Sequence, residues 1–250
     1  MYSIIKFISL CAAVLHLAAC GSASLAPDSR VAQNPWALSS VGSANAQAWS
    51  HYKLPGKTSS QFEYVVEEGR DAIIAKAQSS ASMLRQDMRV EPSSLGNIKF
   101  SWKLPELIAH ADMSQREFDD SPVRVVLAFE GDHSKFSSKN AMLSELAHAL
   151  TGEPMPYATL MYVWCNTCVI GSVISNPHTD RVRKLPLESG PGKLNRWMDY
   201  ERAVHADFVK AFGEEPGPLT SISIMTDTDN TKSIARAWYG PVSLLPVTGK

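Results

Sequence analysis

The 250-residue sequence has few cysteines, no excess of charge of either sign and no familiar catalytic signature. The 24 basic and 25 acidic residues leave a net charge of −1, so nucleic acid is not an expected partner. No P-loop, G-x-G-x-x-G stretch, G-x-S-x-G elbow or H-E-x-x-H pair occurs. The sequence therefore lacks the local motifs by which nucleotide-binding folds, serine hydrolases and zinc proteases are recognised. They do not exclude enzymes that use two distant carboxylates, because glycosidases carry no local signature.

Long apolar runs are also missing, apart from a short one near the start. Residues 8–17 are mainly apolar, follow Lys6 and lead into Ala18-Ala19-Cys20-Gly21. This run is shorter than the roughly 20 residues that span a bilayer, and its flanks are those of a secretory signal. A cysteine after two small residues is typical of a bacterial lipoprotein, although a plain signal peptide is an alternative. We therefore expect a signal peptide over residues 1–19 and acylation, including palmitate, on Cys20.

The same pattern predicts a location. A glycine rather than an aspartate follows Cys20, which favours the outer membrane, with the domain facing the periplasm. Residues 20–43 are rich in alanine, serine, proline and asparagine and predict a tether. Residues 44–250 are sufficient for a single domain with a substantial core.

Strand patterns dominate this domain. Alternation over residues 61–66 and 98–102 predicts half-buried strands, and the continuous apolar run 122–129 predicts a central strand. Further strands are expected over residues 72–77, 159–164, 169–174, 182–187, 221–226 and 234–244. Helical spacing predicts two helices, over 137–151 and 197–212, each followed by a glycine. The expected fold is mainly β: a two-sheet β-sandwich, jelly-roll-like, with two peripheral helices.

Cys165 and Cys168 flank Asn166-Thr167 between two predicted strands. If these two residues form a hairpin turn, the cysteines face each other at a distance that a disulfide tolerates. A structural disulfide is therefore expected. A thioredoxin-like redox pair is the alternative, but that motif belongs at the start of a helix beside a βαβ unit. Zinc is not indicated, because no second cysteine or histidine pair has ligand spacing.

Acidic residues cluster at two places in the sequence. Asp227 and Asp229 alternate in the run 227–231, and carboxylates at a loop entrance are ligands that Ca²⁺ accepts. The alternative is turn chemistry alone, in which short polar side chains cap the loop backbone. Neighbouring carboxylates repel unless a cation, an arginine or backbone N–H groups compensate, and Arg116 and Arg236 are the candidate arginines.

Arg116 would also connect this loop to the acids that precede the central strand. We therefore predict a binding site at one end of the sandwich, with Asp227 and Asp229 as metal ligands, Ca²⁺ as the cation, and core packing as the alternative role of its tryptophan. Its expected residues are Arg116, Asp119, Asp120, Asp227, Asp229, Asn230 and Trp238.

Several stretches together resemble one bacterial family. They are residues 116–120 (REFDD), 157–164 (YATLMYVW), 212–216 (FGEEP), 225–231 (MTDTDNT) and 237–240 (AWYG). The chain resembles, from about Trp49 to Leu244, an exported family known only as a domain of unknown function. The resemblance implies no activity. The chain departs from the pattern at Lys232, where a glycine is expected, and at Pro241, where an acid is expected.

Three functions follow from these features. The first hypothesis is a non-catalytic binding module of the cell envelope, for carbohydrate or another envelope ligand, since sandwich modules stack aromatic faces on sugar rings. The second is a glycan hydrolase that uses two carboxylates drawn from Asp119, Asp120, Asp227 and Asp229. The third is a structural envelope lipoprotein that binds a protein partner.

Replacing Cys20 with alanine tests the lipid anchor. Without this thiol no acyl chain can be attached, so the protein is expected in the soluble periplasmic fraction rather than with membranes. Cell fractionation and incorporation of labelled palmitate measure the change, and Cys11→Ala serves as the control, because Cys11 precedes the predicted cleavage point. A Cys20→Ala variant that still sediments with membranes and takes up palmitate contradicts the lipoprotein interpretation.

Overall fold

The computed structural model describes residues 34–40, 42–43, 45–245 and 247. The predicted signal peptide and Cys20 lie outside these residues. Within the described part of the chain, no helix combines the length and the apolar character needed to cross a bilayer.

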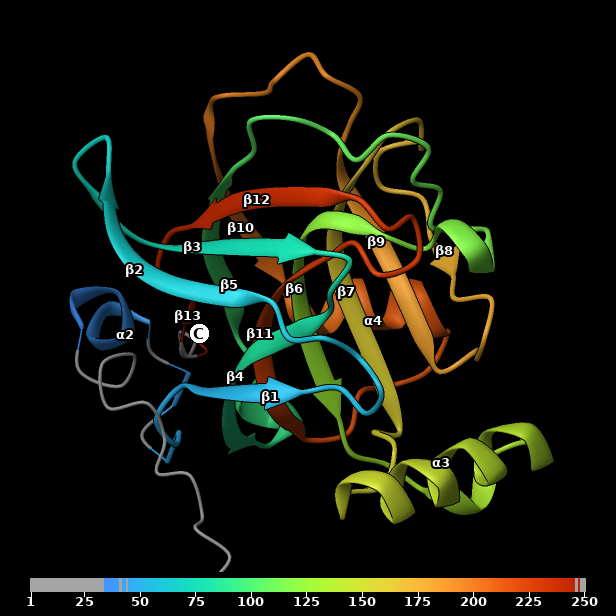
Figure 1. The fold of residues 1–250 in the computed structure, drawn as a ribbon. Coiled ribbons are helices and arrows are strands. Elements are labelled where there is room, and N and C mark those ends of the chain that lie inside the picture. The colour runs from blue at the N-terminus through green and yellow to red at the C-terminus, as the bar shows by residue number, and fades with distance from the viewer. Residues whose placement is uncertain (1–33, 41, 44, 246, 248–250) are drawn as a thin grey trace, which may run out of the picture.

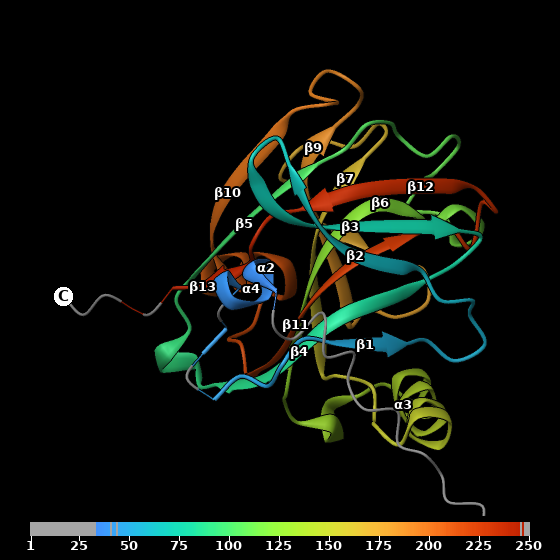
Figure 2. The ribbon, with the colours of Figure 1, turned by 60° about the vertical axis from the view of Figure 1, so that its left-hand side comes forward.

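Two β-sheets pack face to face and confirm the predicted mainly-β sandwich of jelly-roll type (Figures 1 and 2). The larger sheet has seven strands in the order β1-β4-β11-β6-β7-β9-β8, and the smaller has six, counting β13, which pairs with β5 beside the path β10-β5-β12-β3-β2. The pairs are antiparallel except β7–β9. The larger sheet comprises β1 (Ser50–Lys53), β4 (Ser82–Val90), β6 (Ser121–Phe129), β7 (Ala158–Cys165), β8 (Ile174–Ser175), β9 (Val182–Ser189) and β11 (Leu219–Asp227). The smaller comprises β2 (Gln61–Glu67), β3 (Arg70–Gln78), β5 (Asn97–Lys103), β10 (Trp197–Ala203), β12 (Ile234–Tyr239) and β13 (Ser243–Leu244).

One apolar core lies between the sheets and includes inward residues of both. Strand β6 contributes Val125 and Leu127, and β5 contributes Phe100 and Trp102 from the opposite side. Alternate residues of β6, such as Arg124 and Val126, therefore point to the outer face of the larger sheet, because successive side chains of a strand alternate. They are buried as well. Strand β6 is thus covered on both faces, which explains its nearly continuous apolar sequence.

Within the described residues, three α-helices lie around the sandwich. Helix α3 (Ser138–Thr151) starts at an N-cap where the Ser137 hydroxyl accepts from the Asn140 N–H, and it ends at Gly152, whose φ is +80°. This confirms the first predicted helix, and Figure 1 shows it standing away from the two sheets. Helix α4 (Val204–Phe212) inserts Val204 and Phe208 into the core. The short 3₁₀ segments are η1 (Pro92–Ser94), η2 (Arg116–Phe118) and η3 (His133–Lys135).

The second predicted helix is wrong in its first half. Residues Trp197–Ala203 form strand β10, which pairs with β5 along its whole length. Tyr200 fits either pattern, since it lies three residues from Trp197 and two from Met198. The long ladder with β5 decides the conformation, and the helix begins only at Val204.

The predicted hairpin around Asn166-Thr167 is also wrong. Strand β7 pairs with β6 and, in parallel, with β9. Of the expected second strand, residues 169–174, only Ile174 is extended; it belongs to β8, which pairs with β9. The turn therefore connects β7 to an irregular segment rather than to an antiparallel strand that pairs with β7.

The predicted tether is partly folded. Helix α2 (Pro35–Ser39) buries Trp36 completely, and the Trp36 ring lies 4.8 Å from that of Trp49, measured between centroids. The chain is therefore attached to the domain from Asn34 onward. Trp49, Trp102 and Trp164 are buried as expected of core residues, while Trp197 and Trp238 are half-buried.

Candidate functional site

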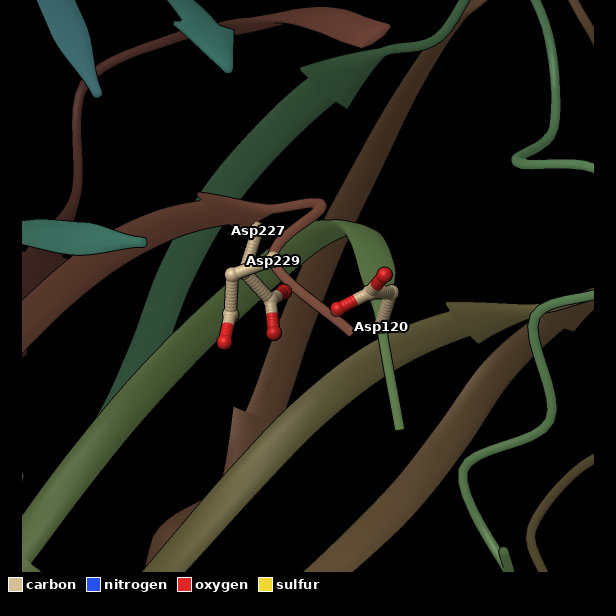
Figure 3. A group of neighbouring side chains, drawn as sticks. All are labelled: Asp120, Asp227 and Asp229. Atoms are coloured by element: carbon tan, nitrogen blue, oxygen red, sulfur yellow. The ribbon is translucent and has the colours of Figure 1, made fainter. Parts of the chain in front are cut away.

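Three aspartates gather at one end of the larger sheet. Asp227 ends β11, and its pairing with Ser121 brings it beside Asp120, which precedes β6. Asp229 follows two residues later. One carboxylate oxygen of each lies within 4.8 Å of the other two. Figure 3 shows the three side chains. The antiparallel pairing of β6 with β11 thus joins the two acidic clusters of the sequence.

A buried ion network neutralises part of this charge. Arg124, on the outer face of β6, donates from Nε to Asp227 Oδ1 at 2.8 Å and from Nη2 to Asp227 Oδ2 at 2.9 Å. The same Nη2 lies 3.2 Å from Asp119 Oδ1. Lys184 of β9 donates to both oxygens of Asp119, at 2.6 and 2.7 Å. All four residues are buried, and we call Asp119, Asp227, Arg124 and Lys184 the buried ion network.

The other two carboxylates hold loops. Asp120 accepts from the backbone N–H groups of Asn230, at 3.1 Å, and Thr231, at 2.7 Å, and from the Thr231 hydroxyl at 2.6 Å. Asp229 forms an ion pair with the half-exposed Lys57. Each of the four aspartates therefore has a cationic or N–H partner, which is the compensation that closely spaced carboxylates require.

Burial shifts the pKa values in the buried ion network. It raises the pKa of Asp227 to about 6, although Arg124 acts in the opposite direction. Burial, followed by the charge of Arg124, lowers the pKa of Lys184 to about 8. Burial also opposes the charge of Arg124, but the attraction of Asp227 and Asp119 leaves its pKa above the ordinary value.

The predicted site residues separate into two groups. Asp119, Asp120, Asp227, Asp229 and Asn230 come together, and Asn230 also donates from Nδ2 to the Arg116 carbonyl at 2.8 Å. The Arg116 side chain itself is exposed.

Trp238 lies elsewhere. It is on the outward face of β12, where the Arg236 guanidinium is 5.6 Å and the Lys103 ammonium 5.4 Å from its ring centroid. Neither Arg116 nor Arg236 pairs with the aspartates, so the prediction of these compensators is wrong. Calcium binding by Asp227 and Asp229 stays a prediction, and both oxygens of Asp227 already accept from Arg124.

Sequence reasoning missed Arg124 and Lys184. Each is a basic residue inside an otherwise apolar strand, Arg124 in Pro122-Val123-Arg124-Val125 and Lys184 in Lys184-Leu185-Pro186-Leu187. A charge in a strand that is buried on both faces needs a partner. That local inconsistency was the available signal.

A groove lies at the opposite end of the same outer face. Its volume is about 620 Å³, and its lining includes Arg85 and Asp87 of β4, Ser221 of β11, Glu130 after β6 and Glu153 after α3. The Pro154-Met155-Pro156 stretch forms an apolar part of the lining. Polar and apolar groups therefore face one another across a concave surface.

Arg85 organises the polar part of the groove. Its Nη2 donates to Asp87 Oδ2 at 3.2 Å and to Glu153 Oε1 at 3.0 Å, and its guanidinium carbon lies 4.0 Å from the centroid of the Tyr52 ring. Burial raises the pKa of Asp87, whereas the hydrogen bond from Arg85 lowers the pKa of Glu153. Asp87 and Glu153, whose pKa values are shifted in opposite directions, thus accept hydrogen bonds from the same nitrogen of Arg85.

The two remaining cysteines form a disulfide. Cys165 and Cys168 have Cα atoms 5.9 Å apart, within the range that a disulfide requires. The predicted pairing therefore occurs in the structure although the predicted hairpin does not. Cys165 is buried at the end of β7, and Cys168 is partly exposed.

Residues 47–243 match a family model described as "Protein of unknown function (DUF3047)". The chain belongs to the DUF3047 family. This confirms the expected membership of a family of unknown function, while the assignment of the particular motifs stays a prediction. Comparison of this DUF3047 protein with curated proteins finds no match.

This DUF3047 protein is similar to several solved structures at low sequence identity and low TM-score. One is the xyloglucanase domain of the type three effector NopAA from Sinorhizobium fredii, at 10% identity and a TM-score of 0.40, over 83% of this chain and 96% of that chain. Another is the endo-1,4-β-glucanase CelB2, at 11% identity and a TM-score of 0.37, over 83% of this chain and 89% of that chain. A third is endoglucanase 3 from Trichoderma harzianum, at 8% identity and a TM-score of 0.40, over 82% of this chain and 99% of that chain. These similarities concern the fold alone.

Replacing Arg124 with methionine tests the buried ion network. Near pH 7.5 the variant leaves Asp227 buried without its counter-charge, and the free energy of unfolding is expected to fall by about 3–5 kcal/mol. The loss should be smaller near pH 5. The pKa of Asp227 is about 6 in the folded protein against 3.8 for the free residue, so the folded state keeps a proton that the unfolded chain has released, and stability falls as the pH rises between these values. Removing Arg124 raises this folded-state pKa further, so the gap between variant and wild type widens above pH 6.

Urea unfolding at the two pH values measures the effect. Arg116→Met is the matched control, because its exposed side chain should contribute no more than about 0.5 kcal/mol. An equal loss for the two variants, or a loss for Arg124→Met that does not depend on pH, would contradict this assignment.

Proposed function

We propose that this DUF3047 protein is a lipid-anchored binding module of the cell envelope that holds a carbohydrate in the groove lined by Arg85, Asp87 and Glu153. The observation that carries the proposal is the fixed arrangement of these three side chains in a concavity of about 620 Å³. Ligand sites in proteins are concave, with a few oriented polar groups on an apolar lining. The Cys20 sequence pattern supports the anchor.

The chemistry of the lining favours a ligand rich in hydroxyl groups. The carboxylates of Asp87 and Glu153 can accept from hydroxyls, and Ser221 offers a donor and an acceptor. The Pro154-Met155-Pro156 stretch provides an apolar surface for the C–H face of a sugar ring. Because Arg85 already holds both carboxylates, their positions are set before a ligand arrives, and less side-chain entropy is lost on binding.

The acidic end of the sheet supports binding less well. Asp119, Asp120, Asp227 and Asp229 are each at most 8% exposed, and each already has a partner inside the protein. A carboxylate that catalyses glycoside hydrolysis must reach the scissile bond and exchange a proton there. The arrangement of these four residues instead supports a role in holding strands and loops.

One observation favours hydrolysis as a second candidate function, in the groove rather than at the acidic end. Asp87 and Glu153 contact the same nitrogen of Arg85, and their pKa values are shifted in opposite directions. A carboxyl with a raised pKa beside one with a lowered pKa is the division of roles that an acid and a nucleophile need. Asp87 would then be the proton donor and Glu153 the ionised partner.

Replacing Glu153 with glutamine tests the groove. The side chain keeps its size but loses its charge, and a hydrogen bond to a charged group contributes about 1.5–3 kcal/mol, so saccharide affinity should fall roughly 10- to 100-fold. Calorimetric titration against a panel of neutral oligosaccharides, including cellobiose, gives the dissociation constants. Asp199→Asn is the control, because Asp199 lines a separate hollow on the outer face of the smaller sheet.

A reducing-sugar assay with the same oligosaccharides, run beside the titrations, separates the two candidates. Release of reducing sugar by the wild type, abolished in both Asp87→Asn and Glu153→Gln, would establish hydrolysis. Binding without turnover would establish a binding module. The proposal fails if no saccharide in the panel binds, or if Asp199→Asn weakens binding as much as Glu153→Gln does.

A further inference from the structure

The Cys165–Cys168 disulfide lies at the protein surface and closes a loop of only four residues. Loop-closure entropy grows with loop length, so a bridge this short stabilises the fold less than one that joins distant segments. Cys165 packs against Met113 and Val163, while Cys168 is partly exposed. Of the two residues, Cys168 is therefore the one that faces solvent, and Cys165 is the protected one.

After reduction, the Cys165 sulfur has a hydrogen-bond partner both as a thiolate and as a thiol. The backbone N–H of Cys168 points at Cys165 Sγ from 3.2 Å, and such a donor stabilises a thiolate. The Glu188 carbonyl oxygen lies 3.6 Å from the same sulfur, where it can accept from a thiol. Attack on Cys168 by an outside thiolate would make Cys165 the leaving group, and a stabilised leaving thiolate speeds exchange.

The surface next to Cys168 suits an extended polypeptide. Val169 is 75% exposed and Ile170 is 57% exposed, directly after the disulfide. Ile170 also lines a hollow of about 150 Å³, together with the apolar residues Leu185, Pro186 and Leu187 and the basic residue Lys210. Within the described residues Lys210 has no ion-pair partner, so its charge is available to a ligand. The complementary segment has apolar side chains and an acidic one.

We propose that Cys165–Cys168 is a thiol–disulfide exchange site that oxidises a dithiol in an apolar, acidic polypeptide segment. A thiolate of the partner attacks Cys168 Sγ, forming a mixed disulfide and breaking the Cys165–Cys168 bond. The electron pair passes to Cys165 Sγ, which takes up a proton. The second partner thiolate then attacks the partner sulfur of the mixed disulfide and releases Cys168, which is also protonated.

This exchange is balanced without a further reactant. The partner loses two electrons and two protons and gains a disulfide, and Cys165 and Cys168 become thiols. The activity is independent of the groove, and it differs from thioredoxin-like sites in that the accessible cysteine is the second of the pair and follows a strand.

Single-turnover exchange with a synthetic peptide tests the proposal. The full-length oxidised protein is mixed at pH 7.5 with a reduced peptide that carries two cysteines separated by leucine and glutamate, and the remaining Cys165–Cys168 disulfide is measured by acid quench, alkylation and mass spectrometry. The expected result is exchange in the folded protein. Ile170→Asp and Lys210→Glu should slow it about 3- to 10-fold while leaving the reaction with glutathione unchanged.

Ile234→Asp is the matched control, because Ile234 is 70% exposed but belongs to β12 of the smaller sheet, whereas Cys165 ends β7 of the larger sheet. Trapping with the oxidised peptide, whose two cysteines form a disulfide, gives a second readout: in Cys165→Ser the Cys168 thiolate should attack the peptide disulfide and accumulate a mixed disulfide as one peptide sulfur leaves as a thiol, whereas Cys168→Ser should not. If the trapping variants do not fold, the rates of the three surface variants decide alone. The proposal is overturned if the peptide reduces the disulfide only after the protein unfolds, if Ile170→Asp and Ile234→Asp behave alike, or if the protein isolated from cells carries two free thiols.

Discussion

The salt bridge between Arg124 and Asp227 joins the two central strands of the larger sheet, and much of the molecule is arranged around it. Arg124 belongs to β6 and Asp227 to the end of β11, and both side chains are buried. Taking two charges out of water is costly, and the attraction between them offsets this only when geometry and further hydrogen bonds are favourable. Here both oxygens of Asp227 accept from the guanidinium, and one of them also accepts from the Ser121 N–H at 3.1 Å.

This salt bridge constrains more than two strands. Asp119 connects Arg124 to Lys184 and so ties β6 to β9 across the intervening β7. Its neighbour Asp120 holds the loop after β11 through the N–H groups of Asn230 and Thr231. A slip of one residue between β6 and β11 would turn Arg124 toward the apolar core, because side chains alternate along a strand. We infer that the buried charges select a single register, at some cost in stability.

The parts of the fold that the sequence predicts correctly are those encoded by local periodicity. The alternation of Ile98, Phe100 and Trp102 predicts β5, and the apolar run from Pro122 predicts β6, because burial of one or both faces leaves a direct trace in the sequence. Trp197 to Ala203 was misread because the segment fits a helix and a strand alike, and only pairing with β5 decides between them. The hairpin predicted after β7 is wrong for a different reason: β7 pairs not with the segment that follows it but with β6 and with β9, and β9 comes after a long irregular connection.

The site shows the same division. Two short acidic runs flank strands that can pair, so the sequence predicts the aspartates as a group. The predicted arginine is the nearby Arg116, whereas the ion pair in the structure is made by Arg124. The groove was not predicted, because Arg85, Asp87 and Glu153 come from a strand and a loop after a helix that are far apart in the sequence.

Helix α2 carries a further consequence. Because Trp36 packs on Trp49, only the chain from Cys20 to Asn34 would separate the domain from a lipid on Cys20. Fully extended, these 14 residue-to-residue intervals span at most about 50 Å. The surface of the domain near Asn34 would then stay within that distance of the membrane.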